Sequence, residues 1–262
     1  MTYCLAISTR GGLVFGSDSR TNAGPDMLSS HSKMHIFNAG PDRVFVLLAA
    51  GNLATTQSIV GRMRQEIEET GKETLRNLSR MKEAARYVSQ LGKEESNSAR
   101  VATATTGVDT SVSLIFGGQI AGGAPGVYMI YSAGNFISES DETPYLQIGE
   151  SKYGKPILDR IVTRDTSLED AARCAIVSMD STIKSNATVG PPIEVLIYER
   201  DSFRTDHHIK LDENDTYLRD IKQAWNEALK CAFSSLPLFH WEQRGGVKLR
   251  SVPDNPPISI QS

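Results

Sequence analysis

Residues 1–20 read MTYCLAISTRGGLVFGSDSR, and this stretch decides the fold. Residues 3–8 and 13–17 are short runs of strand-forming residues, and the TRGG between them is a turn signal. The pattern predicts a β-hairpin with a threonine just before its first strand and Asp-Ser-Arg at the end of its second. Thr2 is therefore either an ordinary strand residue or a reactive group at the open end of the hairpin.

Strands and paired helices alternate along the next 180 or so residues. A second hairpin is predicted around NAGPD, and its run 43–51 is apolar enough to be covered on both faces. The remaining pattern predicts helices at 52–70, 74–91 (ended by Gly92), 151–162 and 167–180, and strands at 34–37, 112–118, 126–133, 144–150 and 192–200. This order indicates two sheets stacked between two helix layers or another α+β arrangement, which periodicity alone does not separate.

After about residue 205 the alternation of strands and helices gives way to a single helical segment and a tail. We expect one domain over residues 1–205, with a helix and a tail over 206–262. The stretch DENDTYLRDIKQAWNEALKCAFSSLP predicts an amphipathic helix that ends before Pro237, and the proline-containing LRSVPDNPPISIQS predicts an extended tail. The adjacent His207 and His208 predict a solvated turn.

Composition limits the classes of function. The chain has 262 residues, of which 39% are hydrophobic and 23% charged, and a net charge of -3, which is typical of a soluble globular protein. No segment concentrates Lys and Arg as a nucleic-acid-binding face would, so we expect no nucleic-acid partner. No apolar run approaches the ~18 residues that a membrane span requires, so we expect no membrane partner.

Cysteine and histidine usage points to an unmodified, metal-free protein. The three cysteines are far apart and odd in number, and the five histidines show no metal-ligand spacing. We therefore expect no disulfide framework, no metal and no cofactor. The N-terminus has neither the basic start nor the apolar core of a signal peptide, so we expect a cytoplasmic protein in which removal of Met1 exposes Thr2.

An N-terminal threonine can supply two catalytic groups at once. Its hydroxyl is a nucleophile, and its own free α-amino group, with a reference pKa of about 7.7–8.0, is a base. A nearby lysine lowers the pKa of that amine by like-charge repulsion, and a carboxylate holds such a lysine in place. Thr2 would therefore need an acidic residue, a lysine and a backbone donor for an oxyanion.

This set occurs in order along the chain. Asp18 ends the second strand, where the hairpin brings it near Thr2, and Lys33 begins the third. The fourth strand ends in LLAAGN, so the backbone N–H of Gly51 can face a developing oxyanion. Alternatively, Asp18 is a strand-end turn residue, Lys33 is a solvated lysine and Gly51 only permits close packing.

The N-terminal third resembles the β-subunits of the proteasome and their bacterial relatives, which are N-terminal-nucleophile hydrolases. Thr2, the Asp18-Ser19-Arg20 motif and Lys33 match the threonine, the acidic motif and the lysine of that family, and Ala50-Gly51 matches its oxyanion wall. The resemblance covers about residues 2–200. SDSRTNAG, IGESKYGKPILD and the long C-terminal helix are most like the bacterial Anbu branch, the ancestral-like β-subunits.

The outer part of the site departs from the family pattern. Where the family places a serine in Gly-Ser-Gly, this chain has Gly149-Glu150-Ser151, so either Ser151 is displaced by one position or Glu150 replaces the serine. The two residues equally fit a helix start with Ser151 as its N-cap. Asp180 and Ser185 match the later Asp and Ser of the family site, without the Gly-Gly that normally follows.

The resemblance implies an αββα sandwich of the N-terminal-nucleophile type with a C-terminal helical extension. It further implies that Thr2 hydrolyses amide bonds of a peptide or protein substrate and that the chain forms a homo-oligomer, either a ring or an open spiral. The resemblance to this family also implies that the substrate pocket is lined by Thr21, Asn22, His31, His35, Ala49 and Leu53. A catalytically silent scaffold and an amidase for a small-molecule amide are the alternatives.

Overall fold

The computed structural model describes residues 2–22, 28–69, 73–105 and 107–243. The chain divides into two units, Met1–Lys222 and Gln223–Ser262, whereas the composition indicated a change near residue 205. The predicted extended tail, residues 249–262, lies outside the described residues. None of the described helices combines the length and the apolar character that crossing a bilayer requires.

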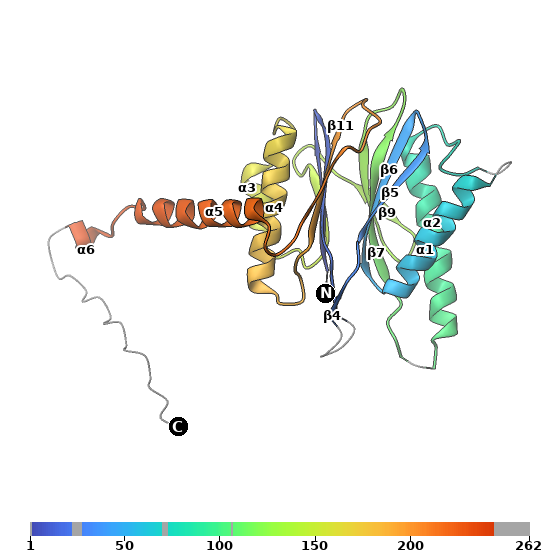
Figure 1. Cartoon of the computed structure of the whole chain (residues 1–262), viewed down its shortest axis with the longest axis horizontal. Coiled ribbons are helices and arrows are strands. Elements are labelled where there is room, and N and C mark those ends of the chain that lie inside the picture. The colour runs from blue at the N-terminus through green and yellow to red at the C-terminus, as the bar shows by residue number, and fades with distance from the viewer. Residues whose placement is uncertain (1, 23–27, 70–72, 106, 244–262) are drawn as a thin grey trace. The chain divides into compact units, whose positions relative to one another are not determined.

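Two five-stranded antiparallel sheets form the centre of the first unit (Figure 1). The first has the order β10-β1-β2-β11-β12, with β1 Tyr3–Thr9, β2 Gly12–Asp18, β10 Tyr145–Gly149, β11 Ile193–Glu199 and β12 His207–Leu211. The second has the order β5-β6-β7-β8-β9, with β5 Met34–Gly40, β6 Arg43–Gly51, β7 Val112–Ile120, β8 Gly126–Ile130 and β9 Phe136–Ser138. A small hairpin of β3 (Arg20–Asn22) and β4 (Leu28–Ser30) leads from one sheet toward the other.

Helices cover the outer face of each sheet. The helices are α1 Leu53–Glu68, α2 Met81–Ala102, α3 Lys155–Ile161, α4 Leu168–Ser185, α5 Thr216–Ser234 and α6 His240–Gln243. In Figure 1, α1 and α2 lie on the second sheet, and α3 and α4 lie on the first. The predicted four-layer αββα sandwich is confirmed.

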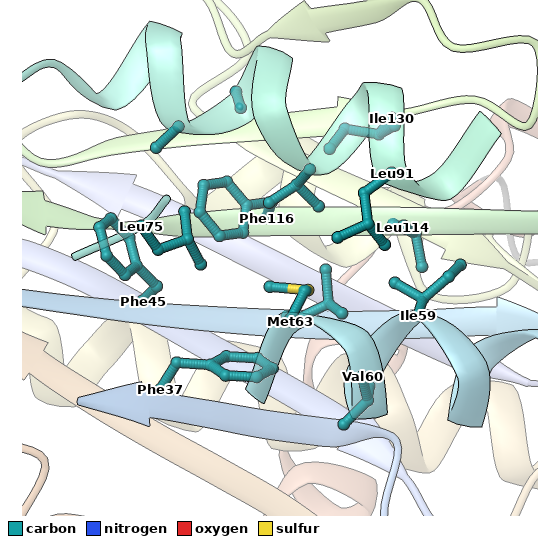
Figure 2. Close-up of a cluster of buried hydrophobic side chains, with 14 of the residues drawn as sticks. Phe37, Phe45, Ile59, Val60, Met63, Leu75, Leu91, Leu114, Phe116 and Ile130 are labelled. Atoms are coloured by element: carbon teal, nitrogen blue, oxygen red, sulfur yellow. The ribbon is translucent and has the colours of Figure 1, made fainter. Parts of the chain in front are cut away.

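Three apolar clusters hold these layers together. One joins α1 and α2 to the second sheet through side chains such as Ile59, Met63 and Phe116, which interdigitate in Figure 2. Another joins α3 and α4 to the first sheet. The third lies between the sheets and includes Cys4, Phe15 and Leu48. Because strand side chains alternate between faces, β1 sends Cys4 toward the other sheet and Tyr3 toward α4.

The first two hairpins are confirmed, and so are the helix that starts near residue 53 and the long C-terminal helix. The predicted end of a helix at Gly92 is wrong, because α2 runs on to Ala102. A glycine costs only about 1 kcal/mol inside a helix, and packing of α2 against β7 outweighs that cost: Gly92 lies beside Leu114.

Two further predictions are corrected. Residues 74–80 are not helical, because the Asn77 side chain accepts from the Thr74 N–H and closes a local turn instead. His207 and His208 belong to a strand rather than a turn, since β12 pairs with β11 along its backbone, while the side chains of both histidines stay exposed. The strand at 192–200 is therefore not the last one of its sheet.

Candidate active site

Thr2 is held at the open end of the first hairpin through the peptide bond that follows it. The Thr2 carbonyl accepts a hydrogen bond of 2.7 Å from the Glu150 N–H. The N–H at the other end of the same peptide group, that of Tyr3, donates to Asp18 Oδ1 at 2.9 Å. Both sides of the Thr2–Tyr3 peptide are therefore anchored, which fixes the backbone from which the Thr2 hydroxyl and α-nitrogen extend.

Asp18 and Lys33 form a buried ion pair beside this peptide. Lys33 Nζ donates to Asp18 Oδ1 at 2.7 Å and to the Arg20 carbonyl at 2.7 Å. The Gly190 N–H donates to the other oxygen, Oδ2, at 3.3 Å. Burial raises the pKa of Asp18, while the Lys33 ammonium and the two backbone donors oppose that rise. The carboxylate thus fixes both the ammonium and the Thr2–Tyr3 peptide.

A cavity of about 340 Å³ opens where the two sheets meet near Thr2. It is lined by Thr2, Arg20, Thr21, Ser32, Lys33, Ala49, Ala50, Gly51, Leu53, Thr56 and Gly149. The predicted nucleophile, lysine and oxyanion glycine therefore share one cavity, although Thr2 lies just before β1, Lys33 just before β5 and Gly51 at the end of β6. Asp18 lies behind the lining and is fully buried.

Two glycines of the lining have backbone conformations that side chains rarely adopt. Gly51 has φ +116°, and a Cβ there would lie 2.3 Å from the Ser111 carbonyl oxygen. Gly149 has φ +81°, and a Cβ there would lie 1.9 Å from the Thr2 carbonyl oxygen. Only glycine fits at either position, so the cavity lining consists of backbone at these two points.

Glu150 and Ser151 occupy different environments. Glu150 is buried, and its Oε2 accepts from the Asn186 side chain at 3.1 Å, in addition to its backbone bond to Thr2. Ser151 contributes its backbone carbonyl to Lys155 N. The N-cap of α3 is Gly154, so the reading of Ser151 as that cap is wrong.

Asp180 and Ser185 lie on α4 and are not joined to this group. Asp180 is buried and forms ion pairs with Lys184 (2.9 Å) and Lys222 (3.6 Å). Among the described residues, no hydrogen bond or ion pair links Asp180 to Thr2 or Lys33. Ser185 is the exposed last residue of α4. The neighbouring segment after α4 reaches the site instead, through Asn186 and Gly190.

The structure places only some of the predicted substrate-binding residues in the cavity lining. Thr21, Ala49 and Leu53 line the cavity, whereas the described lining includes neither His31 nor His35. His31 is exposed. Burial, and then the charge of Arg64, lower the pKa of His35. Asn22 is described only through its backbone, in β3, so its side chain is not placed.

Several residues around the site were not singled out from the sequence. Ser32 and Thr56 line the cavity, and the Gly190 N–H binds Asp18. Glu194 lies in β11 at only 3% exposure, and its carboxylate contacts the hydroxyls of Ser19 (3.2 Å) and Ser32 (2.9 Å). The available signal for Glu194 was a charged residue between Ile193 and the uncharged run 195–198.

Known proteins are similar to this chain over most of its length. The sequence matches the proteasome subunit family over residues 2–198. A proteasome subunit beta of Haloquadratum walsbyi is 25% identical over 213 residues, which cover 81% of this chain and 79% of that protein. The structure is similar to Anbu (ancestral beta-subunit) from Yersinia bercovieri, with a TM-score of 0.85 and 43% identity over 91% of this chain and 98% of that one.

A second solved structure has the same degree of similarity. It is the helical assembly of the Anbu complex from Pseudomonas aeruginosa, with a TM-score of 0.85 and 44% identity. The alignment covers 91% of this chain and 98% of that chain.

Proposed function

The chain belongs to the proteasome subunit family, on the branch of the Anbu proteins, and we propose that it hydrolyses peptide amide bonds through Thr2 after Met1 has been removed. One observation carries the proposal. Lys33 Nζ is fixed by Asp18 and by the Arg20 carbonyl in the wall of the cavity that Thr2 also lines. A buried cation held beside a threonine is the arrangement that an N-terminal nucleophile needs.

The first half of the proposed reaction forms an ester. Thr2 Oγ attacks the carbonyl carbon of the substrate while the Thr2 α-amine takes the hydroxyl proton. The Gly51 N–H stabilises the negative charge that develops on the substrate oxygen. The C–N bond then breaks, the leaving amine takes the proton from the α-ammonium, and the acyl group remains on Thr2 Oγ.

The second half releases the product by the same route. A water molecule attacks the ester carbonyl as the α-amine accepts one of its protons, and Thr2 Oγ leaves with that proton. Lys33 keeps the α-amine unprotonated near neutral pH, because a fixed cation nearby disfavours a second positive charge. Asp18 supports this role by orienting Lys33 and by holding the Tyr3 N–H that follows Thr2.

The proposal gives different roles to the four outer candidates of the site, Glu150, Ser151, Asp180 and Ser185. Glu150 anchors the Thr2 carbonyl through its backbone, and its buried carboxylate places a negative charge near the serine position of the family pattern. Asn186, rather than Ser185, is the residue that the end of α4 directs to Glu150. We assign Asp180 to the stability of α4 through its two lysine partners.

For the substrate and assembly we propose peptides or unfolded proteins acted on by a homo-oligomer. Among the described lining residues only Arg20 and Lys33 are charged, and Lys33 is already paired with Asp18. The cavity therefore offers no further charge that would select a charged substrate side chain. The Pseudomonas aeruginosa relative is described as a helical assembly. We propose that this chain likewise self-associates in the cytoplasm, with the C-terminal helix as a contact element, which sedimentation of the full chain and of a chain truncated after Lys222, where the second unit begins, would test.

The decisive experiment is the intact mass of the protein purified from its native host, followed by an epoxyketone probe. The probe bonds to the hydroxyl and the free α-amine of an N-terminal threonine. We expect a mass that lacks one methionine and a probe adduct on Thr2 that is lost in Thr2→Ala. Thr105→Ala is the matched control, since Thr105 is exposed in a turn. Retention of Met1, with no adduct, would instead favour the catalytically silent scaffold.

A further inference from the structure

We propose that Glu194 is a positioning residue for the Thr2 site, acting through Ser19 and Ser32 on the Asp18–Lys33 pair. This inference rests on the proposed function of Thr2. Glu194 touches neither Thr2 nor Lys33 through any hydrogen bond or ion pair of the described residues. Its effect on the reaction is therefore indirect, and it differs from the catalytic groups in that respect.

Glu194 is a buried carboxylate between the two sheets. It lies second in β11, opposite Ser17 of β2, and is 3% exposed. Leu196, two residues along the strand, belongs to the cluster between the sheets. Because side chains alternate along a strand, Glu194 shares that inward face. A buried charge destabilises the fold unless it is paired and hydrogen-bonded. The partners of the Glu194 carboxylate must therefore explain why a charge is tolerated between the sheets.

The contacts of this carboxylate fall on the immediate neighbours of the ion pair. Oε1 lies 3.2 Å from the Ser19 hydroxyl, and Oε2 lies 2.9 Å from the Ser32 hydroxyl. Ser19 stands between Asp18 and Arg20, which both accept hydrogen bonds from Lys33 Nζ. One carboxylate thus connects the segment that supplies the acceptors with the segment that supplies the ammonium.

The segments that Glu194 connects meet at the end of the β3–β4 hairpin, where the His31 N–H donates to the Ser19 carbonyl at 2.9 Å, and the carboxylate adds a side-chain link beside that backbone bond. Ser19 lies between β2 and β3, and Ser32 lies between β4 and β5. The Ser32 hydroxyl also contacts the Met34 backbone, so it orders the turn just before β5. We infer that the shared anchor on Glu194 fixes the distance between Lys33 and the Thr2 α-nitrogen more tightly than the hairpins alone do.

The negative charge of Glu194 is balanced from the outer strand rather than from the site. His208 Nε2 lies 3.5 Å from Oε2, and Lys210 Nζ lies 3.4 Å from Oε1, both on β12. These two side chains are 36% and 51% exposed. Two other titratable groups, Cys4 and His35, lie close enough to feel the charge of Glu194. Because other cations balance Glu194, the Lys33 ammonium keeps its hydrogen bonds to Asp18 and to the Arg20 carbonyl.

The direction in which the pKa of the Thr2 α-amine changes distinguishes a positioning role of Glu194 from a direct effect of its charge. Removing a negative charge near the Thr2 α-amine, with nothing else moved, lowers the pKa of that amine. Removing the anchor lets the Lys33 cation move away from the amine and raises its pKa. Glu194→Gln tests the two effects against each other. The matched control is Glu199→Gln, at the exposed end of the same strand and about 17 Å away at 3.4 Å per residue.

The experiment uses the full chain beginning at Thr2, produced by cleavage of an N-terminal fusion. The pH dependence of Thr2 α-amine acetylation by acetic anhydride, followed on the N-terminal peptide by mass spectrometry, gives the midpoint for that amine. We expect Glu194→Gln to raise the midpoint by about half a pH unit or more and to lower kcat roughly 10-fold with KM nearly unchanged. Glu199→Gln should change none of these. An unchanged or lowered midpoint in Glu194→Gln would overturn the proposal.

Two further variants keep the test valid if Glu194→Gln does not fold. Ser19→Ala and Ser32→Ala each remove one link and leave the carboxylate in place, so each should raise the midpoint by a smaller amount. Unchanged midpoints in both would overturn the proposal as well. A wild-type chain that hydrolyses no peptide while its amine midpoint still rises in Glu194→Gln would refute the proposed function and leave the positioning role intact.

Discussion

The Lys33 ammonium lies 2.7 Å from Asp18 Oδ1, and both side chains are almost completely removed from solvent. The same oxygen accepts the N–H of the residue after Thr2. Asp18 is therefore the point at which the lysine and the N-terminal strand are joined, and a change at either partner affects both the stability of the fold and the geometry of Thr2.

Replacement of Lys33 by methionine should abolish the proposed chemistry and destabilise the fold. Asp18 would remain buried without its cation, which typically costs about 3–5 kcal/mol. We expect the free energy of unfolding, measured with urea at pH 7, to fall by roughly that amount. Peptide hydrolysis should fall by about 10²-fold or more. The deficit in stability should shrink toward pH 4, because a protonated Asp18 needs no cation.

A double variant provides the control for this prediction. Asp18→Asn combined with Lys33→Met removes both charges, so it should be more stable than Lys33→Met alone while remaining inactive. A double variant as unstable as the sum of the single variants would show that the two side chains do not interact energetically.

Replacement of Gly149 by alanine should displace Thr2. A Cβ at this position would lie 1.9 Å from the Thr2 carbonyl oxygen, so the strand end must shift. We expect epoxyketone labelling of Thr2 to slow by about 10-fold or more. Gly122→Ala is the matched control, because Gly122 has a similar φ of +79° but nothing within 4 Å of its Cβ position. Equal effects of both substitutions would point to backbone strain instead of the clash.

Protonation of His35 should destabilise the fold below about pH 6.5. Burial lowers the pKa of His35 in the folded chain, so between the folded and unfolded pKa values the unfolded chain binds more protons. Stability therefore rises with pH through this window and is lost as the pH falls below the unfolded value. The urea midpoint should follow this trend in the wild type, with a shallower slope in His35→Gln. Identical slopes would exclude His35 as the source.

Enlargement of Ala49 should narrow the cavity. Ala49 is 4% exposed and lines the wall next to Leu53. For Ala49→Val we expect labelling by an epoxyketone with leucine beside the reactive group to slow about 10-fold relative to one with alanine. Ala54→Val, an exposed position of α1, should leave the ratio of the two rates unchanged. A constant ratio in Ala49→Val would place the substrate side chain elsewhere.

The hairpins and the core helices could be predicted because their signals are local. Alternating or continuous apolar runs around TRGG and NAGPD mark β1, β2, β5 and β6, and each turn lies next to the strands it joins. Contacts over longer separations reversed the local prediction at Gly92, where packing of α2 on β7 overrides the cost of a glycine. The same holds for His207 and His208, which pairing with β11 turns into a strand.

The same distinction between local signals and long-range contacts applies to the candidate site. The sequence pattern nominates four candidate residues because each stands at or beside the end of a strand: Thr2, Asp18, Lys33 and Gly51. Asp180 was assigned to the site only through the family resemblance, and in the structure it lies within α4 and forms ion pairs with Lys184 and Lys222. Nothing in the linear order indicates which way a helical carboxylate points.

The sequence by itself determined the first two hairpins, the alternation of strands with paired helices, and the choice of Thr2 as candidate nucleophile with Asp18, Lys33 and Gly51 as its proposed partners. Only the tertiary structure decided that Gly190 caps Asp18, that Asn186 reaches Glu150, and that Glu194 joins Ser19 to Ser32. These contacts bridge residues up to 175 positions apart. Their partners are chosen by how two sheets and their connecting loops pack, and packing depends on the whole chain at once.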